Sequence, residues 1–206
     1  LGGSHGYGGK WSSKVFDMRP YYWGECDCGG DDREDAFMKN KAASLDQAES
    51  LAKEIRGQEA ALTEKLAKMA ASGGEARAIL SVPVHIEKIA VSIERIVDNI
   101  RVKIKEGLLF SDKAIQETGR LLTKGKEVLK KASESIVTGS AASRETVKHE
   151  SDEMIRMSNE FATAHEDRLV AGECSPKTSS NYLCILYAFE DLASHTKDAV
   201  NKFSPK

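Results

Sequence analysis

The most strongly patterned stretch of this 206-residue chain runs from Ile86 to Ile104. Its apolar residues fall at the spacing of one helix face: Ile86, Ile89, Ala90, Ile93, Ile96, Val97, Ile100 and Ile104. On a helix of 3.6 residues per turn they form one continuous apolar stripe, which has to be buried against other elements. The stretch therefore predicts a long helix at the centre of a helical protein.

The charge and composition of the chain exclude several classes of protein. Its 30 Lys and Arg residues nearly balance 32 Asp and Glu residues, so no overall basic field is available for nucleic acid or anionic lipid. No apolar run approaches the roughly 20 residues of a membrane-spanning helix, and no secretory signal peptide is recognisable. The spacing of the four cysteines indicates no disulfide framework, which favours a cytoplasmic location.

The beginning of the chain differs in character from the rest. Residues 1–34 contain both tryptophans and eight of the sixteen glycines, a composition that does not favour a long helix. Cys26, Cys28 and His5 could form a small metal knuckle, but a Cys-x-Cys pair without a second ligand pair is a weak zinc signal. The alternative is an irregular arm that packs on the helical body or is foreign to it. We therefore divide the chain into an arm at 1–40 and a helical bundle at 41–206.

Start and stop signals divide the second region into helices. Ser44 to Gln47 is typical of a capping box, Ser111 can cap a later helix, and Ser175-Pro176 is a cap followed by proline in the first turn. Pro83 either bends its helix or marks a late start. The signals predict five helices, at about 44–71, 75–106, 112–138, 142–171 and 176–203. Helices of this length joined by short loops, with no strand pattern, predict an all-α antiparallel bundle.

An internal repeat relates the second of these helices to the fifth. The segment 93–99 aligns with 189–195, and each is preceded by an amphipathic helix that ends in a short polar turn. The helix at 112–138 then corresponds to the first helix of a second three-helix unit. The matching first helix of the first unit is missing, and the arm stands in its place.

This arrangement resembles the PhoU family over about residues 45–203. The run from Glu94 to Asp98 is similar to the Glu-Arg-Ile-x-Asp signature of that family. The run 165–176, together with 182–190, is similar to the PhoU-like cytosolic tail of bacterial sodium/phosphate cotransporters. The resemblance implies a bundle of two three-helix repeats, here without the first helix of repeat one.

The same resemblance implies a function that is not enzymatic. PhoU proteins regulate phosphate transport or phosphate signalling by binding a transporter or a sensor kinase, which implies a cytoplasmic protein that is at most peripheral to the inner face of the membrane. A homodimer is a further expectation. No Gly-rich phosphate loop and no activated nucleophile is recognisable in the sequence. Di-iron bundles are also disfavoured, because the Glu-x-x-His pairs that they need are missing. The alternative function is a structural helical adaptor that has lost metal binding.

Candidate metal ligands lie on both aligned helices. Several members of the resembled family bind iron or zinc through Glu/Asp-x-x-x-Asp motifs, and Glu94 and Asp98 fit that motif. In the second repeat Glu190 is retained, while Ser194 replaces the aspartate and His195 follows it. Independently of the family, Asp191 and His195 share one helix face with Asp198, at i, i+4 and i+7.

Each of these candidates also has a structural interpretation. Glu94 and Asp98 could pair with basic residues of their own helix, each pair contributing only a few tenths of a kcal/mol. Asp191 and His195 could form a solvated face with a charge-assisted hydrogen bond. Two departures from the family pattern weigh against a full metal cluster: Arg56 and Ile155 occupy positions where acidic ligands are expected. His149 and His165 are predicted to be surface groups.

Overall fold

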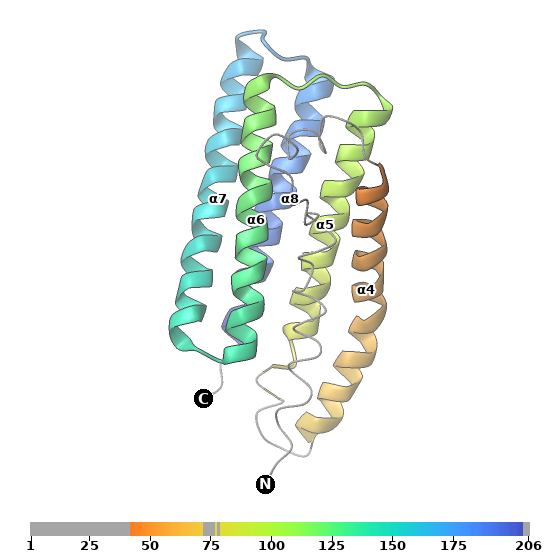
Figure 1. Ribbon diagram of the computed structural model, residues 1–206, viewed down its shortest axis with the longest axis vertical. Coiled ribbons are helices and arrows are strands. Elements are labelled where there is room, and N and C mark those ends of the chain that lie inside the picture. Colours follow the sequence, from red (N-terminus) through yellow and green to blue (C-terminus); the bar gives the residue numbers. More distant parts are fainter. Residues whose placement is uncertain (1–41, 72–76, 78, 204–206) are drawn as a thin grey trace.

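The computed structural model describes residues 42–71, 77 and 79–203, and within these residues it contains helices and no strands. Figure 1 shows five long helices side by side: α4 (Ala42–Ala71), α5 (Val82–Lys105), α6 (Asp112–Thr138), α7 (Ala141–Val170) and α8 (Pro176–Lys202). The prediction of an all-α bundle of five long helices is therefore confirmed. The arm at 1–40 lies outside the described residues. No described helix contains an apolar segment long enough to cross a membrane.

Two of the predicted helix starts are confirmed by their hydrogen bonds. The Ser111 hydroxyl accepts a hydrogen bond from the Ala114 N–H at 3.2 Å, and the Ser175 hydroxyl accepts one from the Thr178 N–H at 3.3 Å. Each bond satisfies an N–H group that has no partner inside the helix. Pro176 follows its cap directly, in the first turn of α8, where the missing proline N–H is not needed.

Two other boundaries differ from the sequence predictions. Helix α4 begins at Ala42, so Ser44 lies inside it and the predicted capping box does not mark its start. Helix α5 begins at Val82 rather than near residue 75, and Pro83 therefore marks a late start and not a bend. Proline is tolerated there because the first-turn N–H groups make no intrahelical bond.

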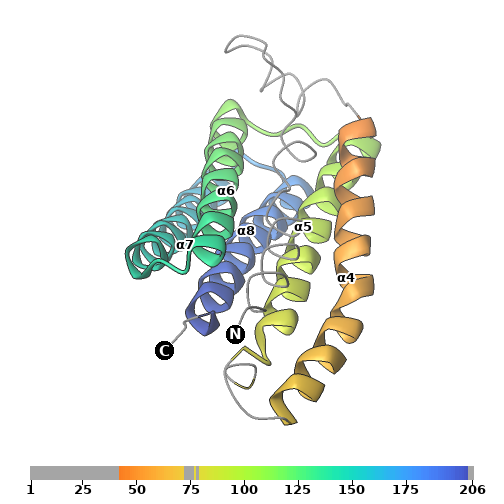
Figure 2. The ribbon, with the colours of Figure 1, turned by 60° about the horizontal axis from the view of Figure 1, so that its bottom comes forward.

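The helices form a three-helix unit and a pair that is joined to it. Helices α6, α7 and α8 all pack against one another, whereas α4 packs against α5. The two parts meet where α5 lies antiparallel to α8 (Figures 1 and 2). Helix α8 therefore contacts α5, α6 and α7, and the centre of the protein lies at the joint between α5 and α8.

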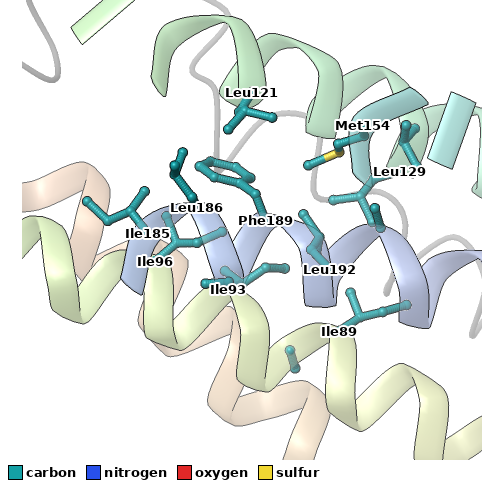
Figure 3. Close-up of a cluster of buried hydrophobic side chains, with 14 of the residues drawn as sticks. Ile89, Ile93, Ile96, Leu121, Leu129, Met154, Ile185, Leu186, Phe189 and Leu192 are labelled. Carbon is teal, nitrogen blue, oxygen red and sulfur yellow. The ribbon is translucent and has the colours of Figure 1, made fainter. Parts of the chain in front are cut away.

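Large apolar side chains fill this joint, as Figure 3 shows. Ile93 of α5 faces Phe189 of α8, with Ile96 nearer to Ile185 and Leu192 nearer to Ile89, and all of these side chains are buried. Leu121 of α6 and Met154 of α7 close the core from the other side. Burying each such side chain contributes about 1.5–3 kcal/mol. Of the predicted stripe from Ile86 to Ile104, every apolar member is buried except Ile104, which is half-buried.

Candidate functional site

Of the two predicted ligands in the middle of α5, Glu94 is paired with an arginine of the neighbouring helix α4. Arg56 of α4 donates through Nη1 to Glu94 Oε2 at 2.9 Å, and its Nε lies 3.8 Å from Glu87 Oε1. The Glu94 side chain is only 15% accessible, whereas Asp98 is exposed. The guanidinium therefore balances the Glu94 charge.

The candidates on α8 separate into two groups. Glu190 and Asp191 are both half-buried, and Asp191 forms an ion pair with Arg95 of α5. Within the described part of the chain, no hydrogen bond joins His195 to Asp191 or Asp198, and its buried Nδ1 atom has no partner. Asp198 follows His195 by three residues on α8, and its carboxylate lies near His85 of α5. Of the predicted stripe on α8, Asp191 therefore pairs with Arg95 of α5, whereas Asp198 lies near His85 of α5.

The second group includes a residue that the sequence did not indicate, His85. It lies in the first turn of α5, opposite His195 and Asp198 in the second half of α8. One potential ligand atom from each residue lies within 4.8 Å of the other two. The His85 Nδ1 atom is 3.8 Å from Asp198 Oδ2, and the two imidazole rings are 6.4 Å apart at 43°. Among the described residues this is the one group of three or more His, Cys, Asp or Glu side chains with such spacing.

Burial disfavours the charged form of both imidazoles of this group. It lowers the pKa of His85 and the pKa of His195 below the ordinary histidine value, since the charged form is less well solvated there. The nearby Lys88 lowers both pKa values further, while Asp198 acts in the opposite direction. A neutral imidazole carries the lone pair that a metal ion requires.

His85 had no sequence signal of its own. It lies beside the apolar stripe of α5, and the residues three, four and seven positions after it in that helix are not Asp, Glu, His or Cys. Only the antiparallel pairing of α5 with α8 brings it to His195. The repeat alignment at 93–99 and 189–195 indicates a relation between the two helices, but it does not give their relative register.

The prediction that His165 lies on the surface is wrong. This side chain is 1% exposed, and its ring packs 4.7 Å from that of Tyr182. The physical reason is its register, because His165 follows the buried Phe161 by four residues on the inner face of α7. His149 is exposed, as predicted.

A buried polar network surrounds His165. Glu117 of α6 accepts a hydrogen bond from the Tyr182 hydroxyl at 2.6 Å and two from Arg168, at 2.8 and 3.2 Å. Burial and the adjacent Glu117 raise the pKa of Tyr182 well above its ordinary value. Burial lowers the pKa of His165, and both of its ring nitrogens lack a hydrogen-bond partner. The network joins all three helices of the α6–α7–α8 unit.

Each of the two regions has a distinct chemical capacity. The buried network satisfies its carboxylate internally and is suited to holding three helices together. The group of His85, His195 and Asp198 presents nitrogen and oxygen donors without a neutralising arginine. Comparison with protein-family models, with curated proteins and with solved structures found no match to this chain.

Proposed function

We propose that the protein is a non-catalytic helical module that regulates phosphate transport or phosphate signalling by binding a transporter or a sensor kinase. The observation that carries the proposal is the joint between α5 and α8. Residues that the repeat aligns, Ile93 with Phe189 and Ile96 with Leu192, are all buried in this joint, where Ile93 faces Phe189 (Figure 3). Such packing of equivalent helices favours a protein built from two related units, of which α6, α7 and α8 form one.

The polar groups of the core support a role without catalysis. Tyr182, whose pKa burial and Glu117 raise well above its ordinary value, donates a hydrogen bond to Glu117, and Arg168 donates to the same carboxylate. Glu117 and Tyr182 are buried in the interior of one three-helix unit, and the half-buried Arg168 holds Glu117 from α7. This arrangement resists movement and supports a scaffold for protein binding. The proposed location is the cytoplasm, peripheral to the membrane at most, with a homodimer as one form of assembly.

A second candidate function is favoured by the arginines near the predicted ligands. Arg56 of α4 pairs with Glu94 of α5, and Arg95 of α5 pairs with Asp191 of α8. A carboxylate that is held by a guanidinium is a poor ligand for a cation, since the ion pair has to break first. The Arg56–Glu94 pair therefore favours a structural adaptor in which the carboxylate motif of α5 has lost metal binding.

The phosphate proposal is tested by uptake measurements in cells of the source organism. Deletion of the gene should change the rate of phosphate uptake, and re-expression of the full chain should restore it. Sulfate uptake is the matched control, because a general loss of membrane function would alter both rates. If phosphate uptake and the phosphate-starvation response are both unchanged by the deletion, the proposal is contradicted and the structural adaptor is preferred.

A further inference from the structure

We infer that His85, His195 and Asp198 bind one divalent transition-metal ion, with Zn²⁺ as the natural probe, across the joint between α5 and α8. This site is separate from the Glu/Asp-x-x-x-Asp motif, none of whose residues it contains. The inference also stands apart from the proposed role in phosphate transport, because metal binding can be measured without any uptake.

The distances require only small side-chain movements to form such a site. In a tetrahedral zinc site with bonds of about 2.0–2.1 Å, neighbouring ligand atoms are roughly 3.3 Å apart. The His85 Nδ1 to Asp198 Oδ2 distance is 3.8 Å, and all three ligand atoms lie within 4.8 Å of one another. His195 and Asp198 already share one face of α8 at i, i+3 spacing. Rotation of the three side chains can therefore close the site without moving either helix.

Unsatisfied polar atoms provide an independent reason to expect a ligand there. The Nδ1 atoms of His85 and His195 are both buried, and neither has a hydrogen-bond partner. A buried polar atom without a partner costs free energy, and native proteins rarely leave one unexplained. An ion bound by an imidazole through such an atom supplies the partner that it lacks.

The donor set restricts the chemical class of the ion. Two imidazole nitrogens and one carboxylate oxygen suit zinc and its first-row neighbours, whereas magnesium and calcium prefer oxygen ligands alone. The charged groups nearby are mixed in sign: Lys88 and Lys202 oppose a cation, while Asp191 and Asp198 favour it. Because Asp191 pairs with Arg95, Asp198 is the carboxylate that supplies the oxygen ligand.

A bound ion would connect two distant parts of the chain. It would link the first turn of α5 to the second half of α8. The unfolded chain does not bring these three ligands together, so the ion binds the folded state preferentially. Zinc should therefore raise the unfolding temperature of the protein.

The direct test is a zinc titration of the full chain in competition with a chromogenic chelator. The wild-type protein should bind one Zn²⁺ at this site. Changes to groups that only support ligands already cost about 10–100-fold in affinity, so removing a ligand should cost at least about 100-fold. This loss is expected for His85→Ala, for His195→Ala and for Asp198→Asn. His149→Ala is the matched control, since His149 is an exposed histidine of α7 and should leave the affinity unchanged.

Two further measurements make the outcome unambiguous. The Cys26→Ser/Cys28→Ser double variant removes the thiols of the arm, and it should retain the zinc affinity of the wild type. Co²⁺ bound at the proposed site should show visible bands of a nitrogen and oxygen site, without thiolate charge transfer. Circular dichroism identifies any variant that fails to fold, and Asp198→Asn, the most conservative change, then decides. Equal affinity in all ligand variants that fold, no saturable binding, or loss of binding in the cysteine variant alone would each overturn the inference.

Discussion

The middle of α5 and its N-terminal end both carry candidate metal ligands, but neighbouring helices treat them differently. In the middle, Arg56 of α4 neutralises Glu94 through Oε2, although the buried Oε1 atom has no hydrogen-bond partner, and Arg95 neutralises Asp191 of the facing α8. At the end, His85 and His195 each keep a buried Nδ1 atom without a hydrogen-bond partner. Spacing along one helix shows which side chains share a face. Whether those side chains are available to a ligand is decided by the helix packed opposite.

The largest effect is expected where the two regions depend on the same packing, at Phe189. This side chain is fully buried in the joint that sets the register of α5 on α8 (Figure 3). Phe189→Ala removes its ring and leaves a cavity, which should lower the free energy of unfolding by about 3–5 kcal/mol. Urea denaturation followed by circular dichroism measures the change.

The control for Phe189 is Tyr187, an aromatic residue on the exposed side of the same helix. Tyr187→Ala should change the free energy of unfolding by no more than about 0.5 kcal/mol. If the two variants were equally stable, the α5–α8 joint would not be the centre of the protein, and the comparison of its two regions would lose its basis.

The next effect distinguishes the two regions by their response to zinc. At a free zinc concentration of 100 times the dissociation constant, a folded-state ligand stabilises a protein by about 2.7 kcal/mol. We expect this gain for the wild type and not for Asp198→Asn. Glu94→Gln, in the middle of α5, should retain it. The experiment is urea denaturation with and without zinc, in the Cys26→Ser/Cys28→Ser background so that arm thiols do not bind the ion. A gain that is lost with Glu94→Gln and kept with Asp198→Asn would reverse the comparison.

A smaller effect is expected from pH, through the buried His165. Burial and the neighbouring Arg168 lower its pKa in the folded protein, while Glu117 and Glu166 oppose the shift. The unfolded chain therefore binds a proton near the ordinary histidine pKa of about 6.5, which the folded protein does not yet bind. Stability should fall as the pH falls through this value, and the loss should stop below the folded-state pKa. One such group contributes at most about 1.4 kcal/mol per pH unit.

The pH effect of His165 is isolated by comparing two histidines of the same helix. Urea denaturation between pH 7.5 and pH 5.5, with a chelator present, should show a weaker pH dependence for His165→Gln than for the wild type. His149→Gln removes an exposed histidine and should leave the pH dependence unchanged. An unchanged slope in His165→Gln would show that this side chain is protonated equally in both states.

The features that were predictable from the sequence are local in origin. The apolar stripe from Ile86 to Ile104 and the caps at Ser111 and Ser175 depend on residues within one or two turns, and the structure contains all of them. The burial of His165 and the meeting of His85 with His195 depend on how one helix is placed against another. That placement comes from the packing of many side chains, and no short motif contains it.

The smallest effect compares the two arginines that hold the carboxylates. Arg95 and Asp191 are both nearly half exposed, at 44% and 46%, and such a pair contributes about 0.2–1 kcal/mol. Glu94 is only 15% accessible, so removing Arg56 leaves a carboxylate that water solvates poorly. Arg56→Met should therefore lower the free energy of unfolding by more than Arg95→Met, by about 1 kcal/mol against a few tenths. The ranking should persist in high salt, since the less accessible pair is screened less. Equal losses would mean that Glu94 is as well solvated as Asp191, and that its carboxylate is as available to a cation as the sequence motif implies.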